Sequence, residues 1–239
     1  MTNISDKPII LSIAGFDPCS GAGVTSDVKT AELTGSYALG VNTAITIQHE
    51  SKFTDVTWIN KKEVIDQLEI LLEKYNFEFI KIGLIEDISL IETIYQICPD
   101  AKIIWDPILK ASAGFNFHRI TSKNLLKKIA GLCYLITPNL NEWDKMKALI
   151  EGRTNILLKG GHAKNHANDI LLHKDGSETT LKGERIEVTE KHGSGCVLST
   201  AITSYLSQGY TLKEACKKGK EYITDYLQSS DSLLGTHIT

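Results

Sequence analysis

Short apolar runs alternate with amphipathic segments along most of the chain. The first run, residues 9–15, is apolar at nearly every position and rich in β-branched residues, which is typical of a strand covered on both faces. A turn-forming loop follows, and then a helical pattern that ends at Gly35. Repeated along the chain, this pattern predicts strands at 9–15, 41–48, 78–83, 101–105, 133–136 and 155–159, and helices at 24–33, 64–74, 89–97, 122–130 and 140–149.

The alternation changes after residue 159. Two strand-like segments flank Lys174-Asp175-Gly176, which predicts a β-hairpin, and two helical patterns close the chain. These last elements are expected at 169–173, 177–181, 195–206 and 212–227. Alternating strands and helices indicate an α/β fold with a doubly wound, mostly parallel central sheet, right-handed crossovers and helices on both faces. Because no linker or internal repeat interrupts the pattern, we interpret residues 1–239 as a single domain.

The charge balance argues against a polyanionic partner. The 239 residues contain 26 Lys and Arg against 29 Asp and Glu, a formal net charge of −3, with no basic block. We therefore expect a small-molecule partner rather than nucleic acid or a membrane surface. The five cysteines are scattered, without zinc-site spacing, and no apolar run is long enough for a signal peptide core or a membrane span. We expect a cytoplasmic protein; the sequence permits a homodimer but does not fix the oligomeric state.

Polar and glycine residues follow the carboxyl ends of the expected strands. In a parallel sheet these ends lie at one edge, where the ligands of open α/β folds bind. The residues in these positions are therefore expected to converge on one site: Asp17, Gln48, Gly83, Asp106, Asn139, Lys159, Gly160 and Gly161.

The segment from His192 to Cys196 lies where a polar loop meets an apolar helical run. A helix N-terminus presents unpaired backbone N–H groups and partial positive charge, and Gly193 and Gly195 lack a Cβ that would keep a phosphate away. The same environment is expected to lower the pKa of Cys196, which favours an anion cradle beside a candidate general base. A structural Gly-Ser-Gly turn with a buried cysteine is the alternative. His192 either positions the glycine turn or is an ordinary loop residue.

A series of short motifs runs through nearly the whole chain. They are the loop at 14–23, Thr46-Ile47-Gln48, Lys81-Ile82-Gly83, Trp105-Asp106-Pro107-Ile108, the segment 136–142, Leu158-Lys159-Gly160-Gly161-His162 and His192-Gly193-Ser194-Gly195-Cys196. In this order they resemble the bacterial hydroxymethylpyrimidine and phosphomethylpyrimidine kinases of thiamine synthesis, which belong to the ribokinase superfamily. The resemblance implies transfer of the ATP γ-phosphoryl group to the hydroxymethyl group of 4-amino-5-hydroxymethyl-2-methylpyrimidine, and then to the resulting monophosphate.

The resemblance also implies roles for individual residues. Cys196 stands where the family has its candidate base, and the backbone amides of Gly193, Ser194 and Gly195 would stabilise charge on the transferred phosphoryl group. The amide of Gln48 suits the aminopyrimidine edge. The other expected substrate contacts are Gly15, Ala22, Asp27 and Leu84. The expected ATP contacts are Asp106, Asn139, Lys159 and Gly161, and Glu142 is expected to hold Mg²⁺ through water.

Several of these residues also have simpler interpretations that the sequence leaves open. Asn139 and Glu142 have the spacing of a helix capping box, so they could simply begin a helix. Asp27 could be an ordinary exposed helix carboxylate. Gln48 and Lys159 could be solvated residues at strand ends.

The chain departs from the family pattern in three places. Ser112 stands where the family commonly has a lysine, and the sequence leaves open whether Lys110, two residues earlier, takes its place. Phe16 replaces a small hydroxyl residue near the expected substrate pocket. The segment 146–156 is shorter than in typical members, which leaves nucleotide preference open.

Four other functions compete with this one. The glycines at 21–23 after a strand faintly resemble a dinucleotide-binding fingerprint, but the loop is too long and the third glycine is Ser26. His162 and His166 have zinc-like spacing but lack the glutamate of a metalloprotease helix. Within the superfamily, a pyridoxal or pyridoxine kinase is the nearest alternative. A non-catalytic pyrimidine-binding relative is the alternative outside enzymes.

Overall fold

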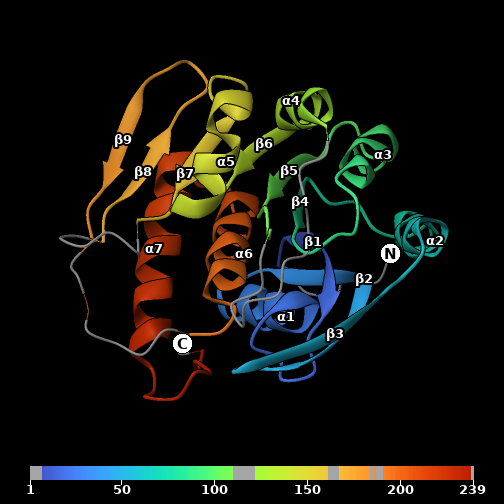
Figure 1. The fold of residues 1–239 in the computed structure, drawn as a ribbon, viewed down its shortest axis with the longest axis horizontal. Coiled ribbons are helices and arrows are strands. Elements are labelled where there is room, and N and C mark those ends of the chain that lie inside the picture. Colours follow the sequence, from blue (N-terminus) through green and yellow to red (C-terminus); the bar gives the residue numbers. More distant parts are fainter. Residues whose placement is uncertain (1–6, 110–121, 161–166, 184–185, 187–190, 238–239) are drawn as a thin grey trace.

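The computed structural model (Figure 1) describes residues 7–109, 122–160, 167–183, 186 and 191–237, which form a sheet with helices on both faces. In this part of the chain the strand order is β3-β2-β1-β4-β5-β6-β7-β8-β9. The strands are β1 (Ile9–Phe16), β2 (Tyr37–His49), β3 (Lys52–Trp58), β4 (Phe79–Ile82), β5 (Lys102–Trp105), β6 (Cys133–Ile136), β7 (Asn155–Leu158), β8 (Asp169–Leu172) and β9 (Glu178–Leu181). The helices are α1 (Gly23–Leu33), α2 (Lys61–Leu72), α3 (Ser89–Ile97), α4 (Lys123–Leu132), α5 (Leu140–Ile150), α6 (Ser194–Ser207) and α7 (Leu212–Gln228).

The sheet is parallel in its centre and antiparallel at its edges. Strands β2, β1, β4, β5, β6 and β7 pair in parallel, whereas β3 pairs antiparallel with β2, and β8 and β9 pair antiparallel at the other edge. This confirms the expected mostly parallel α/β sheet and the β-hairpin. The chain leaves β1 for β2 and β3 on one side and returns to β4 on the other. Such a reversal of strand order opens the ligand crevice of α/β sheets.

One strand was not expected from the sequence. Residues 52–58 form β3, and β2 begins at Tyr37 rather than at residue 41. No position of β3 is fully buried, so the strand lacks the continuous apolar run that marks its neighbours. Its formation depends on the pairing of its backbone with β2, which residue composition does not report.

Two hydrophobic cores lie on opposite faces of the sheet. One contains buried residues of α2, α3, α4 and α5, and the other contains buried residues of α1, α6 and α7. Figure 1 shows α6 and α7 side by side on the second face. Helix α6 packs against β1, β4 and β5, at the point where the strand order reverses. None of the helices in the described ranges combines the length and the apolar character that a membrane span requires.

A buried carboxylate joins four of these elements. Asp27 of α1 is 0% exposed and accepts hydrogen bonds from Ser12 Oγ of β1 at 2.5 Å, Lys81 Nζ of β4 at 2.8 Å and Thr200 Oγ1 of α6 at 2.7 Å. Burial alone would lower the pKa of Lys81, but the neighbouring negative groups, Asp27 foremost, together outweigh burial and raise the pKa, so the ammonium stays protonated. These contacts fix α6 against the sheet by directional bonds as well as by apolar packing.

The charge of Asp27 makes Lys81 a sensitive position. We expect Lys81→Met to lower the free energy of unfolding by about 3–5 kcal/mol, because the substitution leaves a buried carboxylate without its counter-charge. The double variant Lys81→Met/Asp27→Asn should be more stable than the single variant. Lys102→Met removes a lysine from an exposed pair with Glu78 and should cost less than about 1 kcal/mol. Urea unfolding measures the free energy of unfolding of all three variants. A value for Lys81→Met within about 1 kcal/mol of wild type would contradict the expected cost of leaving Asp27 without its counter-charge.

Candidate active site

Helix α6 begins at the carboxyl edge of the sheet with a glycine turn. Its N-cap, Gly193, has a φ of 75°, and a Cβ there would lie 1.9 Å from the carbonyl oxygen of Gly21. Almost all of the helix is buried, but Ser194 and Gly195 in its first turn are partly exposed. The first backbone N–H groups of a helix have no partner within it. The structure confirms the expected helix start, and binding of an anion there stays a prediction.

A lysine and a carboxylate lie against this first turn. Lys159, directly after β7, places Nζ 2.9 Å from Asp106 Oδ1, and Thr137 Oγ1 donates to the same oxygen at 3.1 Å. A Cβ at Gly195 would lie 3.2 Å from Lys159 Nζ and 3.5 Å from Asp106 Oδ2. Burial lowers the pKa of Lys159, whereas the charges of Asp106 and Glu142 raise it. The net effect leaves this pKa above its usual value. A protonated ammonium therefore lies beside the N-terminus of α6.

Asn139 and Glu142 form the capping box at the start of α5. Asn139 Oδ1 accepts from the Glu142 backbone N–H at 3.0 Å, and Glu142 Oε2 accepts from the Asn139 backbone N–H at 2.8 Å. This confirms the structural interpretation of the pair. Burial raises the pKa of Glu142 to about 6, and Lys159 only partly offsets this. Each carboxylate oxygen still has acceptor capacity, so water-mediated Mg²⁺ binding fits this donor set.

The expected substrate contacts lie on the β1 and β2 side of the site. Leu84 is buried, and a Cβ at Gly15 would lie 3.0 Å from Leu84 Cδ2, so these two residues are in contact. Thr46 Oγ1 donates to the Phe16 carbonyl oxygen at 2.9 Å and fastens the end of β2 to the loop after β1. Gln48 follows on the same strand, at an irregularity in its pairing with β3, and is partly exposed. Its contact with a pyrimidine stays a prediction.

The structure corrects two expectations about buried groups. Burial raises the pKa of the Cys196 thiol to about 11, and the nearby Lys81 ammonium opposes this only in part, so the expected lowering is wrong. The hydrogen bond from the Gly23 backbone also lowers the pKa, but by less than burial raises it. The interpretation of Asp27 as an exposed carboxylate is also wrong, because its oxygens bind three buried donors. Its expected contact with substrate stays a prediction that these internal bonds do not favour.

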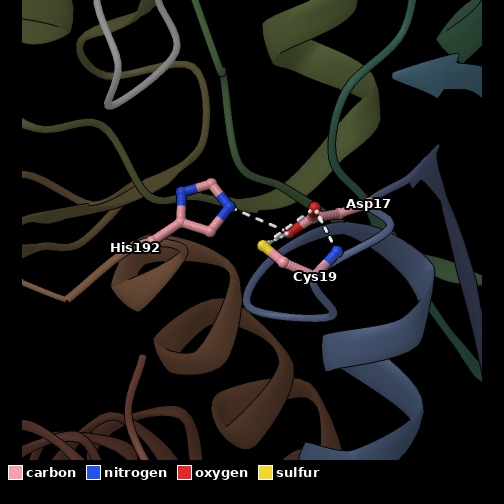
Figure 2. A group of neighbouring side chains, drawn as sticks. All are labelled: Asp17, Cys19 and His192. Carbon is pink, nitrogen blue, oxygen red and sulfur yellow. Dashed lines mark hydrogen bonds and ion pairs between the residues drawn. The ribbon is translucent and has the colours of Figure 1, made fainter. Parts of the chain in front are cut away.

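A cluster of three polar side chains at the same edge was not recognised as a unit from the sequence (Figure 2). His192 Nε2 lies 2.8 Å from Asp17 Oδ2, and Cys19 Sγ lies 3.2 Å from Asp17 Oδ1. Their ligand atoms lie within 4.8 Å of one another, close enough for a metal ion. Both Asp17 oxygens already accept backbone N–H groups, from Cys19 and Ala22, so hydrogen bonding alone accounts for the cluster. Asp17 and His192 were noted separately in the sequence, but their 175-residue separation concealed their contact.

Five residues discussed above lie outside the described part of the chain. They are Lys110, Ser112, Gly161, His162 and His166. The expectations attached to them, including the ATP contact of Gly161 and the zinc-like spacing of the histidines, stay predictions. The short segment 146–156 is described and consists of the end of α5, a turn and the start of β7.

The fold and the site define a class of protein. A parallel sheet whose carboxyl edge brings together a glycine-rich helix start, a lysine and acidic side chains has the parts of a phosphoryl-transfer enzyme. A family model described as phosphomethylpyrimidine kinase matches residues 17–238. The chain therefore belongs to the phosphomethylpyrimidine kinase family, as the sequence motifs implied, and is a kinase of that family.

Curated relatives agree with this assignment. The hydroxymethylpyrimidine/phosphomethylpyrimidine kinase of Aquifex aeolicus is 31% identical over 247 residues, which cover 94% of this chain and 96% of that protein. The bifunctional thiamine biosynthesis protein ThiDN of Methanocaldococcus jannaschii is 32% identical over 222 residues and 90% of this chain. The chain spans about half (52%) of the length of that second relative.

Solved structures give the same fold. A phosphomethylpyrimidine kinase from Clostridium difficile 630 has a TM-score of 0.74 and 32% identity, covering 92% of this chain and 99% of that one. An ADP complex of Bacillus subtilis pyridoxal kinase has a TM-score of 0.80 and 24% identity, covering 95% and 94%. The second likeness shows the fold alone.

The pKa of Glu142 predicts a pH dependence of stability. A folded-state pKa of about 6, against an ordinary 4.5, means that the folded protein binds this proton more tightly than the unfolded chain. The resulting stabilisation of the folded state, about 2 kcal/mol, is fully present below pH 4.5 and is lost as the pH rises through 6. Glu142→Gln should remove it, as urea unfolding between pH 4 and 8 would show.

Glu214 provides the matched control, because it fills the same capping-box position in α7 but is exposed. Hydrogen bonds from Thr211 lower the pKa of Glu214, so its contribution to stability is lost as the pH falls rather than as it rises. Glu214→Gln should leave the pH dependence between 4.5 and 7 unchanged. An identical pH profile for wild type and Glu142→Gln would show that Glu142 ionises normally.

Proposed function

We propose that this protein transfers the γ-phosphoryl group of ATP to the hydroxymethyl group of 4-amino-5-hydroxymethyl-2-methylpyrimidine, and then to the monophosphate, in thiamine diphosphate biosynthesis. Family membership supports the reaction class. The observation that carries the proposal is the position of Gly195 at the start of α6, where a Cβ would lie 3.2 Å from Lys159 Nζ and 3.5 Å from Asp106 Oδ2. Phosphoryl transfer depends mainly on positioning and on electrostatic stabilisation, and this junction supplies both.

The N-terminus of α6 would receive the transferred phosphoryl group. The backbone N–H groups of residues 193–196, which we call the anion cradle, lie at the N-terminus of α6, where the helix carries partial positive charge. That of Ser194 donates to the Lys191 carbonyl oxygen at 3.3 Å in the free protein, and an anion would compete for it. Lys159 adds a full positive charge beside them. In the free protein this charge pairs with Asp106, and nucleotide phosphates would compete for the same ammonium. These groups would stabilise charge where it develops in the transition state.

The nucleotide side of the site can accommodate a divalent cation. Glu142 and Asp106 offer carboxylate oxygens close to Lys159, which is the ligand chemistry that Mg²⁺ prefers. A bound Mg²⁺ would neutralise charge on the nucleotide phosphates. Glu142 would hold the ion through water, because its direct hydrogen bonds already begin α5.

Cys196 is the candidate for the group beside the acceptor hydroxyl. Its sulfur lies where two helix N-termini meet, since it belongs to the first turn of α6 and accepts a hydrogen bond from the backbone N–H of Gly23 at the start of α1. With a pKa of about 11 the thiol is protonated at neutral pH. If it is the base, only the small thiolate fraction is active, and turnover must rise with pH.

Pyridoxal kinase is the alternative within the same fold. The Bacillus subtilis pyridoxal kinase has a TM-score of 0.80, against 0.74 for the phosphomethylpyrimidine kinase, so the fold itself does not distinguish the two substrates. The sequence identity is higher with the phosphomethylpyrimidine kinase, 32% against 24%, which favours the pyrimidine as substrate. A coupled ADP-release assay with hydroxymethylpyrimidine, its monophosphate, pyridoxal and ribose separates the two. Turnover with pyridoxal alone would replace the proposed substrate, and pyrimidine binding without any turnover would indicate a non-catalytic relative.

The role of Cys196 predicts a specific pH profile. We expect wild-type kcat to rise about tenfold per pH unit between pH 7 and 9.5, because the thiolate is the active form. Cys196→Ala should lower kcat at least about 100-fold, abolish this rise and leave KM for the pyrimidine nearly unchanged. Cys216→Ala changes an equally buried cysteine in α7 and should keep the wild-type profile. A Cys196→Ala enzyme with wild-type kcat would remove Cys196 as the base.

The placement of Gln48 predicts a change in substrate affinity. Gln48→Ala should raise KM for hydroxymethylpyrimidine about tenfold and change kcat little, because the amide would bind ground state and transition state alike. The KM for ATP should stay the same. Gln96→Ala, an exposed position on α3, serves as the control. An unaltered pyrimidine KM would contradict the proposed contact.

A further inference from the structure

Two loops that are distant in the sequence meet at the start of α6 (Figure 2). We call them the first loop, residues 17–22 after β1, and the glycine loop, residues 191–196. A Cβ at Gly21 would lie 2.7 Å from His192 Cδ2, and one at Gly193 would lie 1.9 Å from the Gly21 carbonyl oxygen. The two backbones are therefore in direct contact, and a shift of one loop displaces the other.

A hydrogen bond between side chains links the two loops. His192 Nε2 lies 2.8 Å from Asp17 Oδ2, and both residues are buried, at 6% and 1% exposure. Burial alone would raise the pKa of Asp17, but hydrogen bonds from His192, Cys19 and the Ala22 backbone outweigh burial and lower it. An ionised carboxylate only accepts hydrogen bonds, so the proton of this contact belongs to His192 Nε2.

The same carboxylate oxygen connects the starts of two helices. Asp17 Oδ2 accepts the backbone N–H of Ala22, the N-cap of α1, at 2.8 Å. It also accepts His192, which directly precedes Gly193, the N-cap of α6. One oxygen thus fixes the distance between the two N-termini on either side of Cys196. The first terminus belongs to the expected pyrimidine pocket and the second to the anion cradle.

His192 is oriented from one side only. Its Nδ1 is buried and has no hydrogen-bond partner among the described residues, and Figure 2 shows it facing away from Asp17. Buried polar atoms usually have a hydrogen-bond partner, so this nitrogen is an exception. In the described structure, Asp17 is therefore the only side chain that sets the position of this ring through a hydrogen bond.

The glycine loop has a second, independent attachment. The His192 backbone N–H donates to the Leu233 carbonyl oxygen at 2.9 Å, and the buried Lys191 ammonium donates to the carbonyl oxygens of Ser230 and Ser232. These contacts hold the loop to the segment after α7 without involving Asp17. Loss of the His192–Asp17 bond should therefore displace the loop without unfolding it.

We propose that Asp17 and His192 form a clasp that sets the anion cradle at its working distance from the pyrimidine pocket, which makes both of them positioning residues for phosphoryl transfer. The proposal rests on the proposed function for its kinetic consequence and on geometry alone for its structural one. A misplacement of about 1 Å between reacting groups costs roughly 100-fold in rate. The clasp thus acts on kcat rather than on the affinity for either substrate.

Two substitutions of His192 that differ in reach test the kinetic consequence. His192→Gln places an amide donor near the position of Nε2, whereas the shorter His192→Asn does not reach Asp17. We expect His192→Asn to lower kcat about 100-fold with both KM values within about threefold, and His192→Gln to recover most of that loss. Asp17→Ala combined with His192→Asn should be no slower than the slower single variant, because both break the same contact. Equal kcat for wild type and His192→Asn, with both proteins folded by thermal melting, overturns the proposal.

An NMR measurement tests the clasp without any assay of activity. The backbone amide resonances of Gly193 and Gly195 report the position of the anion cradle. Asp17→Ala, a change in the other loop, should shift both resonances, whereas Asp175→Ala in the distant β8–β9 turn should shift neither. Unmoved resonances in Asp17→Ala would overturn the clasp even if the protein phosphorylates the pyrimidine. Shifted resonances in a protein that turns over none of the four candidate substrates would retain the clasp and reject the proposed function.

Discussion

The structure depends on one buried carboxylate at the point where the strand order reverses. Asp27 receives hydrogen bonds from β1, β4 and α6 while belonging to α1 itself. Apolar packing alone would leave α6 free to slide along the sheet, because hydrophobic contacts are not directional. A buried ion pair is weak evidence of net stability, but it penalises any arrangement that separates its partners. The position of the first turn of α6, and therefore of the candidate active site, follows from this constraint.

Burial and helix geometry act against each other on the sulfur of Cys196. Two helix N-termini and the Lys81 ammonium favour a thiolate there, whereas the loss of solvent favours the thiol and raises the pKa to about 11. The same geometry suits a phosphoryl group better than a thiolate, because an incoming anion brings its charge to the exposed start of the helix rather than to its buried side. The site is therefore organised around positioning and fixed positive charge. That is the demand that phosphoryl transfer makes of a protein.

The sequence pattern predicted most of the fold because its strands are covered on both faces. Continuous apolar runs and capped helices are local features, so the elements from β4 to α7 were predicted within a few residues. Strand β3 was missed because an exposed edge strand leaves no such signal. The expectation that residues after the carboxyl ends of the parallel strands converge correctly placed Asp106 beside Lys159, because it depends only on the topology of the sheet. The environments of Cys196 and Asp27 could not be predicted, because burial and contact with Lys81 are properties of the packed structure. The Asp17–His192 contact was concealed for the same reason.

Transfer of the phosphoryl group at the anion cradle, beside Cys196, can be seen in a crystal structure of the protein with hydroxymethylpyrimidine and a non-hydrolysable ATP analogue. Oxygens of the terminal phosphoryl group should lie about 2.7–3.1 Å from the backbone nitrogens of Gly195 and Cys196, with the hydroxymethyl group next to the Cys196 sulfur. A nucleotide whose terminal phosphate lies away from the start of α6 would show that the anion cradle does not receive the phosphoryl group.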